Sequence, residues 1–131
     1  YAGSPVACAA ALAVLDVIAE EKLLDRANAM GVRIKAKLNS LASRNDVVPI
    51  TGIRGYGAMI GFDIVKAHGV YEPDAEATKR VTAAALEEGL ILLSCGVYAN
   101  AIRILVPLTA SDAVLDEGME KLERALAAAR I

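Results

Sequence analysis

Aromatic residues are scarce in this sequence, and aliphatic side chains and alanine supply most of its hydrophobic content. The 131 residues contain no Trp, one Phe and four Tyr, yet 56% of them are hydrophobic and 23% are charged. This balance excludes a mainly disordered chain, which would have few apolar residues. The length fits one domain, and we expect a core of packed helices with few aromatic anchors.

Residues that form disulfides or bind metals are also few. Cys8 and Cys95 lie far apart in sequence with no second thiol or histidine near either, and the single histidine, His68, has no ligand-type neighbour. This spacing fits neither a disulfide framework nor a zinc site, and it agrees with a reducing compartment. We therefore expect a cytoplasmic protein without a metal site.

The sequence has neither a long hydrophobic run nor a basic cluster. The longest apolar run, Val6 to Leu15, is too short to span a bilayer and lacks the basic leader and cleavage site of a signal peptide. The net charge is −2, and basic residues are interleaved with acidic ones. Phosphate backbones require a clustered basic face instead. Neither a membrane nor a nucleic acid is an expected partner.

Periodicity and capping residues predict alternating groups of helices and strands. Helices are expected at residues 5–20 with Ser4 as N-cap, at 22–44, from 73–74 to Gly89, and from the capping-box segment 109–112 onward. Extended segments or strands are expected at 47–55, 58–65, 90–94 and 101–106. The strands come in pairs with short connections. We therefore expect an α+β fold of two layers, with a small, mainly antiparallel sheet and helices packed on one face.

The first helix is expected to be apolar nearly all round. Such a helix needs cover on several sides. The sequence also begins at Tyr1 without a methionine, and we interpret the start as a cut through a longer protein. The predicted organisation is an interdomain or interface helix at residues 1–20 and a small domain at 21–131. Alone, the chain should self-associate through this helix or leave it detached.

Arg103 is the only charge in the apolar segment Ala101–Val106. A guanidinium in such a strand needs an anion, and its fork geometry suits a carboxylate held by two hydrogen bonds. The pattern alone leaves two structural alternatives open, which are an internal ion pair and an arginine on an exposed edge strand.

No complete catalytic site is evident elsewhere. The six lysines lie in polar company, whereas a Schiff-base lysine needs a desolvated or cationic setting. There is no Ser/His/Asp set. The segment Arg54–Gly57 resembles a phosphate loop, but a strand follows it where a dinucleotide fingerprint requires a helix, so it is interpreted as a tight turn. We predict no catalytic, cofactor-binding or metal-binding residue in the chain.

Three segments together resemble the class III aminotransferases, a pyridoxal-phosphate-dependent fold-type I family, and are most similar to its 4-aminobutyrate branch. They are Tyr1–Pro5 with the alanine-rich helix, Gly52–Met59, and Gly89–Gly96 running into Ile102–Leu108. The similarity covers almost the whole chain in the right order, and it implies that the chain is the small C-terminal domain of such an enzyme.

The resemblance also implies a reaction and a role for one residue. Enzymes of this branch transfer the amino group of 4-aminobutyrate to 2-oxoglutarate, giving succinate semialdehyde and glutamate. The position of Arg103 binds the substrate carboxylate, in particular the α-carboxylate of the keto acid or of glutamate. The cofactor is held mainly by a large domain outside this sequence, in a homodimer or dimer of dimers, so the fragment itself should be inactive.

Two alternatives remain at this point. One is a parent enzyme acting on ornithine, acetylornithine or another ω-amino acid, because donor choice depends largely on residues outside this sequence. The other is a non-catalytic α+β ligand-binding module with an arginine in its sheet. A lysine-bearing large domain directly upstream in the gene would favour the enzyme.

Overall fold

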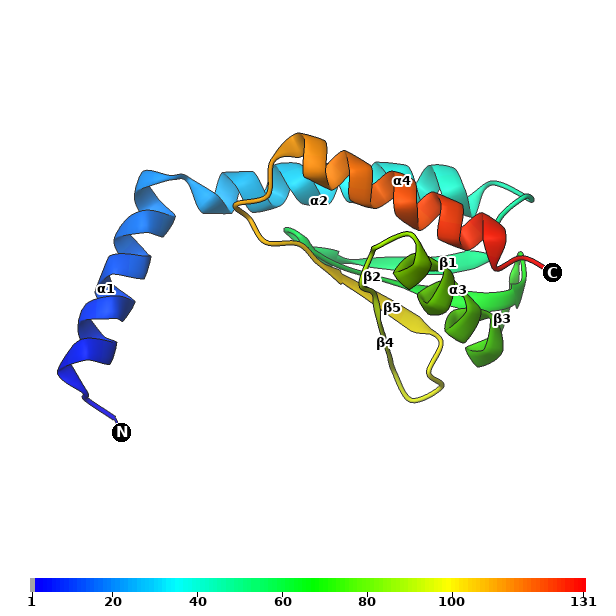
Figure 1. Cartoon of the computed structure of the whole chain (residues 1–131), viewed down its shortest axis with the longest axis horizontal. Coiled ribbons are helices and arrows are strands. Elements are labelled where there is room, and N and C mark those ends of the chain that lie inside the picture. The colour runs from blue at the N-terminus through cyan, green and yellow to red at the C-terminus, as the bar shows by residue number, and fades with distance from the viewer. Residues whose placement is uncertain (1) are drawn as a thin grey trace.

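A computed structural model describes residues 2–131, so Tyr1, the first residue of the motif that runs to Pro5, lies outside the described residues. The elements in chain order are α1 (Pro5–Glu20), α2 (Leu23–Ala42), β1 (Ile50–Tyr56), β2 (Met59–Ala67), β3 (Val70–Pro73), α3 (Ala75–Glu87), β4 (Leu93–Cys95), β5 (Ala101–Leu105) and α4 (Asp112–Ala128). Helices α2, α3 and α4 cover one face of an antiparallel sheet (Figure 1). The predicted two-layer α+β fold is confirmed.

The sheet is built around β2. Its strand order is β1-β2-β5-β4, and β3 pairs with β2 outside this path. Every pairing is antiparallel. Both β2 and β5 have a neighbour on each side, which makes β5 an inner strand. Arg103 therefore does not lie on an edge strand, and that structural alternative is wrong.

Two strand predictions need correction. Strand β3 was not predicted, because it is only four residues long and pairs at two positions, too short for an alternating pattern to be visible. The apolar run 90–94 was predicted to be a strand throughout, but β4 begins only at Leu93. Leu90 and Leu92 pack against the core instead, so burial rather than sheet pairing accounts for their hydrophobicity.

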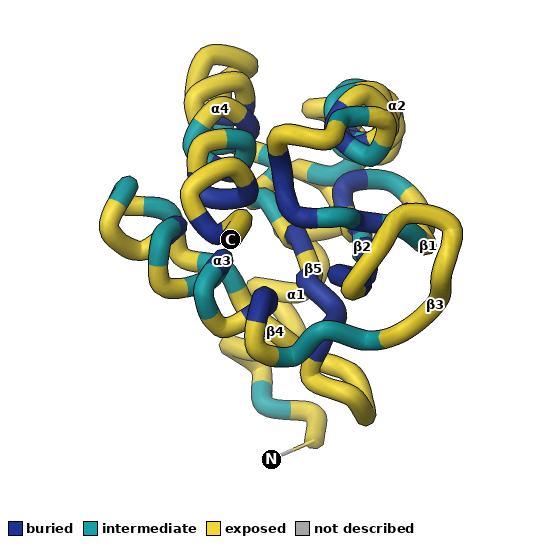
Figure 2. The backbone as a smooth tube through the Cα atoms, turned by 90° about the vertical axis from the view of Figure 1, so that its right-hand side faces the viewer, coloured by how far each residue is buried: buried dark blue, intermediate teal, exposed yellow. Residues whose placement is uncertain are grey.

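The core lies between the sheet and the helices. Figure 2 shows the buried segments of the strands facing α2 and α4. The spacing of apolar residues predicts which faces are buried, and the structure buries Met30, Ile34, Leu38 and Leu41 of α2, Ile60, Phe62 and Ile64 of β2, and Leu115, Met119, Leu122 and Leu126 of α4. Leu23 and Ala27, which the same spacing places on the α2 stripe, are only partly buried. Among residues 2–131 no helix packs on the opposite face of the sheet, and we call this surface the open face.

The spacing in residues 22–44 leaves the basic side chains off the apolar stripe, where solvation is expected, but several of them bind acidic residues of α4. Arg26 and Arg33 both contact Asp112, and Arg33 also binds Asp116 at 2.6 Å. Lys37 binds Glu123, which also binds Arg44, the second residue beyond the end of α2. The sequence pattern placed these residues correctly off the buried stripe, but it could not show that a second helix lies alongside.

We expect the free energy of unfolding to depend on pH in the acid range, because the Glu123 carboxylate binds both Lys37 and Arg44. Hydrogen bonds from Lys37 and then Arg44 lower the pKa of Glu123 below its ordinary value of 4.5. A lowered folded pKa gives stability that is present above the ordinary value and is lost as the pH falls through the folded value. Glu123→Gln should cost roughly 1 kcal/mol at neutral pH, allowing for solvent screening.

Urea unfolding of the wild type and of Glu123→Gln at a series of acidic pH values tests this prediction. The difference in free energy of unfolding between wild type and variant should shrink as the pH falls. Glu120→Gln is the matched control, because Glu120 lies exposed on the same helix and has no ion pair among residues 2–131. A difference that stays constant with pH would contradict the assignment.

Helix α1 stands apart from the rest of the molecule. It projects away from the two-layer body at its junction with α2 (Figure 1), and none of its residues is buried. Val6 is 81% exposed, Leu12 65% and Leu15 62%. Within residues 2–131, no helix combines the length and the hydrophobicity that a membrane crossing requires. The two-layer body does not cover this helix.

Candidate functional site

Arg103 lies on the open face of the sheet. Its neighbours Ile102 and Ile104 are buried under the helices, and because side chains alternate along a strand, Arg103 points to the other side, where it is exposed. We expected a charge enclosed in an apolar strand, and this is wrong for the chain by itself. Because solvent can hydrate its guanidinium, Arg103 does not need a carboxylate partner within the chain.

The strand register places two arginines in one row across the open face. Arg103 of β5 pairs directly with Gly61 of β2, which pairs on its other side with Arg54 of β1. Leu93 of β4 completes the row beside Arg103. The two guanidinium-bearing strands are thus separated by one strand that has no side chain at this position.

Arg54 is already engaged by a carboxylate. Its Nη1 and Nη2 atoms donate to Oδ2 and Oδ1 of Asp63 at 2.7 and 2.8 Å, and Nη1 also donates to the Gly52 carbonyl oxygen at 2.6 Å. Tyr71 donates from its hydroxyl to Oδ2 of Asp63 at 3.1 Å. Hydrogen bonding to Asp63 raises the pKa of both Arg54 and Tyr71. The Arg54 charge is therefore neutralised within the domain.

Arg103, by contrast, has no ion pair with any residue from 2 to 131. The alternative of a structural ion pair thus has no support within the described chain. The two arginines of the row differ in role: Arg54 holds β1 to β2 through Asp63, whereas Arg103 has a free fork of donors. Such a fork can bind an external carboxylate through two parallel hydrogen bonds.

The structure also identifies functional candidates that sequence reasoning missed. Arg54 had been assigned to a tight turn, and the turn is present at residues 56–59, but Asp63 and Tyr71 were not singled out. Asp63 is 4% exposed in an otherwise apolar part of β2, between Phe62 and Ile64. A lone charge in an apolar strand is the same signal that identified Arg103, so Asp63 could have been found by it.

An apolar row borders the arginine row. Tyr56, Met59 and Leu105 pair across β1, β2 and β5, and they are 91%, 53% and 64% exposed respectively. An anion bound at Arg103 would therefore have apolar surface on one side, which suits the methylene carbons of an aliphatic acid.

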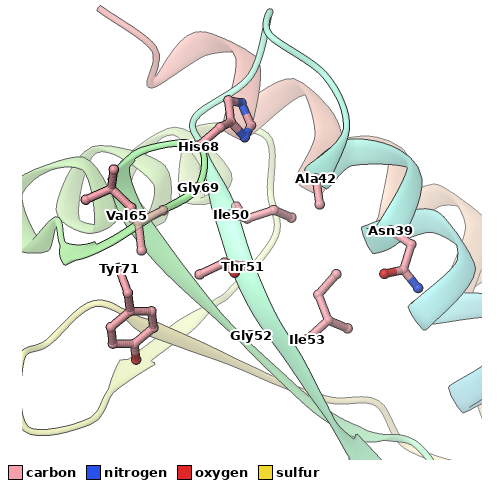
Figure 3. A pocket seen from close by; sticks show the side chains of 11 residues that line it. Asn39, Ala42, Ile50, Thr51, Gly52, Ile53, Val65, His68, Gly69 and Tyr71 are labelled. Carbon is pink, nitrogen blue, oxygen red and sulfur yellow. The ribbon is translucent and has the colours of Figure 1, made fainter.

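A second hollow lies at the outer edge of β1. It has a volume of about 480 Å³, and Figure 3 shows Asn39 and Ala42 of α2 on one side and His68 and Tyr71 of the β2–β3 hairpin on another. Neither Lys nor Arg lines it. This hollow therefore lacks the fixed positive charge that the predicted carboxylate site needs, and Arg103 is not part of it.

The six lysines lie at or near the surface of the described chain. Five of the six bind oxygen atoms at or near the surface: Lys35 the Gly55 carbonyl, Lys37 Glu123, Lys66 Glu72, Lys79 Glu76, and Lys121 Glu117. Lys22 precedes α2 and is exposed. None has the desolvated setting that lowers a lysine pKa for Schiff-base chemistry. Within residues 2–131, no cluster of His, Cys, Asp or Glu could hold a metal ion.

Comparison with known proteins gives one consistent family. The profile of the family described as aminotransferase class-III matches residues 1–126. A 5-aminovalerate aminotransferase of Pseudomonas putida is 52% identical over 97% of this chain and 29% of its own length. A 4-aminobutyrate aminotransferase of Escherichia coli is 46% identical over 92% of this chain and 28% of its own length. The chain thus spans less than a third of the curated relatives it matches.

Solved structures agree with this comparison. A phospholyase from Arthrobacter in complex with phosphoethanolamine superposes with a TM-score of 0.83 at 31% identity, covering 94% of this chain and 29% of that one. A pyridoxal-phosphate-bound amine transaminase from an uncultivated Pseudomonas species gives 0.80 at 33% identity, covering 94% and 27%. One fold therefore serves different reactions, and the substrate has to be inferred from site residues.

Proposed function

The chain belongs to the class III aminotransferase family, and from this premise we propose that it is the small C-terminal domain of an enzyme that transfers the amino group of 4-aminobutyrate to 2-oxoglutarate. The products are succinate semialdehyde and glutamate. In this proposal Arg103 binds the α-carboxylate of the keto acid or of glutamate. The nitrogen moves from one substrate to the other, so no net oxidant is required.

One observation carries the proposal. Arg103 is exposed on an inner strand without an internal carboxylate partner, while Arg54, in the same row, is neutralised by Asp63. A single free guanidinium next to an apolar row fits a substrate that has a carboxylate and a short aliphatic chain. Relatives named for 4-aminobutyrate and 5-aminovalerate act on acids of this kind, which supports the same substrate class here.

The amino donor has a second candidate, 5-aminovalerate, because the relative that is 52% identical is named for it. The two donors differ by one methylene, a difference that pockets discriminate by only about 10–200-fold. A donor panel with 2-oxoglutarate as acceptor, assayed on the full-length protein, separates them. The panel should include ornithine and acetylornithine, and either of these giving the highest kcat/KM would contradict the proposed donor class.

The cofactor of the proposed enzyme is pyridoxal 5′-phosphate, which supplies the electron sink for amino-group transfer. The lysines described above do not fit a covalent site for it. We therefore assign cofactor binding mainly to a large domain outside this sequence. We further propose that residues 1–20 form an interdomain or interface helix, in a cytoplasmic homodimer or dimer of dimers. The uncovered state of α1 supports this organisation.

We expect the isolated chain neither to bind pyridoxal phosphate covalently nor to transaminate, because no lysine within it has a suitable environment. Purified chain is incubated with the cofactor, reduced with borohydride, dialysed and analysed by absorbance and mass spectrometry. The expected result is no specific, stoichiometric adduct. A single lysine modified in full, with an absorbance band that survives dialysis, would show that the chain contains a cofactor site after all.

A further inference from the structure

Gly61 occupies the centre of the arginine row, and the backbone does not explain why this position is glycine. Its φ angle is not positive, unlike that of Gly55 near the end of β1 or of Gly57 in the adjacent turn. A Cβ atom at Gly55 would lie 2.0 Å from the Met59 carbonyl oxygen, whereas at Gly61 it would meet only the Ile102 carbonyl oxygen, at 3.7 Å. Within residues 2–131, therefore, neither strain nor packing requires glycine at position 61.

The missing side chain leaves a gap on the open face. Neighbouring strands lie about 4.7–4.9 Å apart, so the strands of Arg54 and Arg103 are separated by roughly 10 Å, with Gly61 as the floor between them. Asp63 lies two residues along β2 from Gly61. Its carboxylate binds the Arg54 guanidinium, which also donates to the Gly52 carbonyl oxygen. Arg103, on the other side of the gap, has no ion pair with any residue from 2 to 131.

We propose that Gly61 is a specificity-determining residue that keeps this gap open, so that a substrate α-carboxylate can lie against the sheet and meet the Arg103 guanidinium with both oxygens. This inference rests on the proposed function and deepens it. Any side chain larger than a methyl group at position 61 projects between the two arginine stems, because directly opposite Cβ atoms on one face lie only about 4.5–5.5 Å apart. It would displace the carboxylate without removing the charge that attracts it.

The test is a size series, Gly61→Ala, Gly61→Val and Gly61→Leu, in the full-length protein. The two half-reactions are measured separately, one with glutamate or 2-oxoglutarate and one with 4-aminobutyrate, which has no α-carboxylate. We expect the KM for glutamate and 2-oxoglutarate to rise with side-chain size, reaching about tenfold or more for Val and Leu. The KM for 4-aminobutyrate should change much less. Val suits a strand position, so this variant should fold even if Leu does not.

Thermal melting and cofactor absorbance of each variant serve as the structural readouts. A KM for the α-carboxylate substrates that does not depend on side-chain size, in variants with wild-type melting, overturns the role of Gly61. An equal loss in both half-reactions also overturns it, since that pattern indicates general disturbance. Arg103→Ala distinguishes a failure of the proposed function from a failure of the inference about Gly61. If Arg103→Ala impairs use of the keto acid and the Gly61 variants do not, the proposed function stands and only the inference about Gly61 fails.

Discussion

Replacing Arg103 by alanine in the full-length protein is expected to weaken the use of 2-oxoglutarate by roughly 2–4 kcal/mol in transition-state free energy. The reason is that the open face has no second free guanidinium in the arginine row to take over the carboxylate, because Arg54 is bound to Asp63. The effect should fall on kcat/KM for the keto acid and for glutamate. The cofactor absorbance should be nearly unchanged.

Arg54→Ala is the matched comparison, because it removes the same side chain from the same row. It leaves the Asp63 carboxylate, which is 4% exposed, without its bidentate partner, so its main effect should be a lower melting temperature. Arg103 lacks such a partner, and its removal should leave the melting temperature close to that of the wild type. If Arg103→Ala retained wild-type kinetics with the keto acid but lost thermal stability, Arg103 would be structural.

The isolated chain is expected to self-associate at micromolar and higher concentrations, and removal of residues 1–20 should give a monomer. Five apolar side chains of α1 are 42–81% exposed: Val6, Leu12, Val14, Leu15 and Val17. Burying one such side chain contributes about 1.5–3 kcal/mol. Burying several in a pair of helices therefore contributes a free energy comparable to the entropic cost of association. Exposed apolar surface of this extent marks an interface in a soluble protein.

Light scattering over a concentration series measures this association for the whole chain and for residues 21–131. Limited proteolysis at Ala19–Lys22, where α1 meets α2, reports whether the junction is accessible. A double variant, Leu12→Gln with Leu15→Gln, lowers the apolar area without shortening the helix and should shift the equilibrium toward monomer. A compact monomer that resists proteases at all concentrations would show that the domain covers α1 itself in solution.

Much of the local structure could be predicted because it depends on neighbours in sequence. Helices were predicted to begin at Pro73–Asp74 and within residues 109–112. In the structure, the side chains of Asp74 and Ser111 accept hydrogen bonds from the backbone N–H groups of Ala77 and Val114. Gly89 was predicted to end a helix, and its φ of 77° is accessible mainly to glycine. Ser4 is an exception, since it precedes α1 but makes no side-chain capping hydrogen bond.

Pairing between distant segments accounts for what the pattern missed. The acids that bind the basic residues of α2 lie more than 75 positions away on α4, and no periodicity within either helix indicates that the two pack together. Strand β3 is too short to show alternation, and it was found only through its pairing with β2. The same holds for Asp63, whose partner Arg54 comes from the neighbouring strand.

The sequence by itself determined the fold class, the buried faces of the helices and strands, and Arg103 as the candidate carboxylate-binding residue. These follow from periodicity and from the cost of placing a charge among apolar residues. Only the tertiary structure decided that Arg103 is exposed on an inner strand, that Arg54 is neutralised by Asp63, and that Gly61 separates the two arginines. The physical reason is that strand register, which brings residues 54, 61 and 103 into one row, is a property of pairing between strands and not of any one of them.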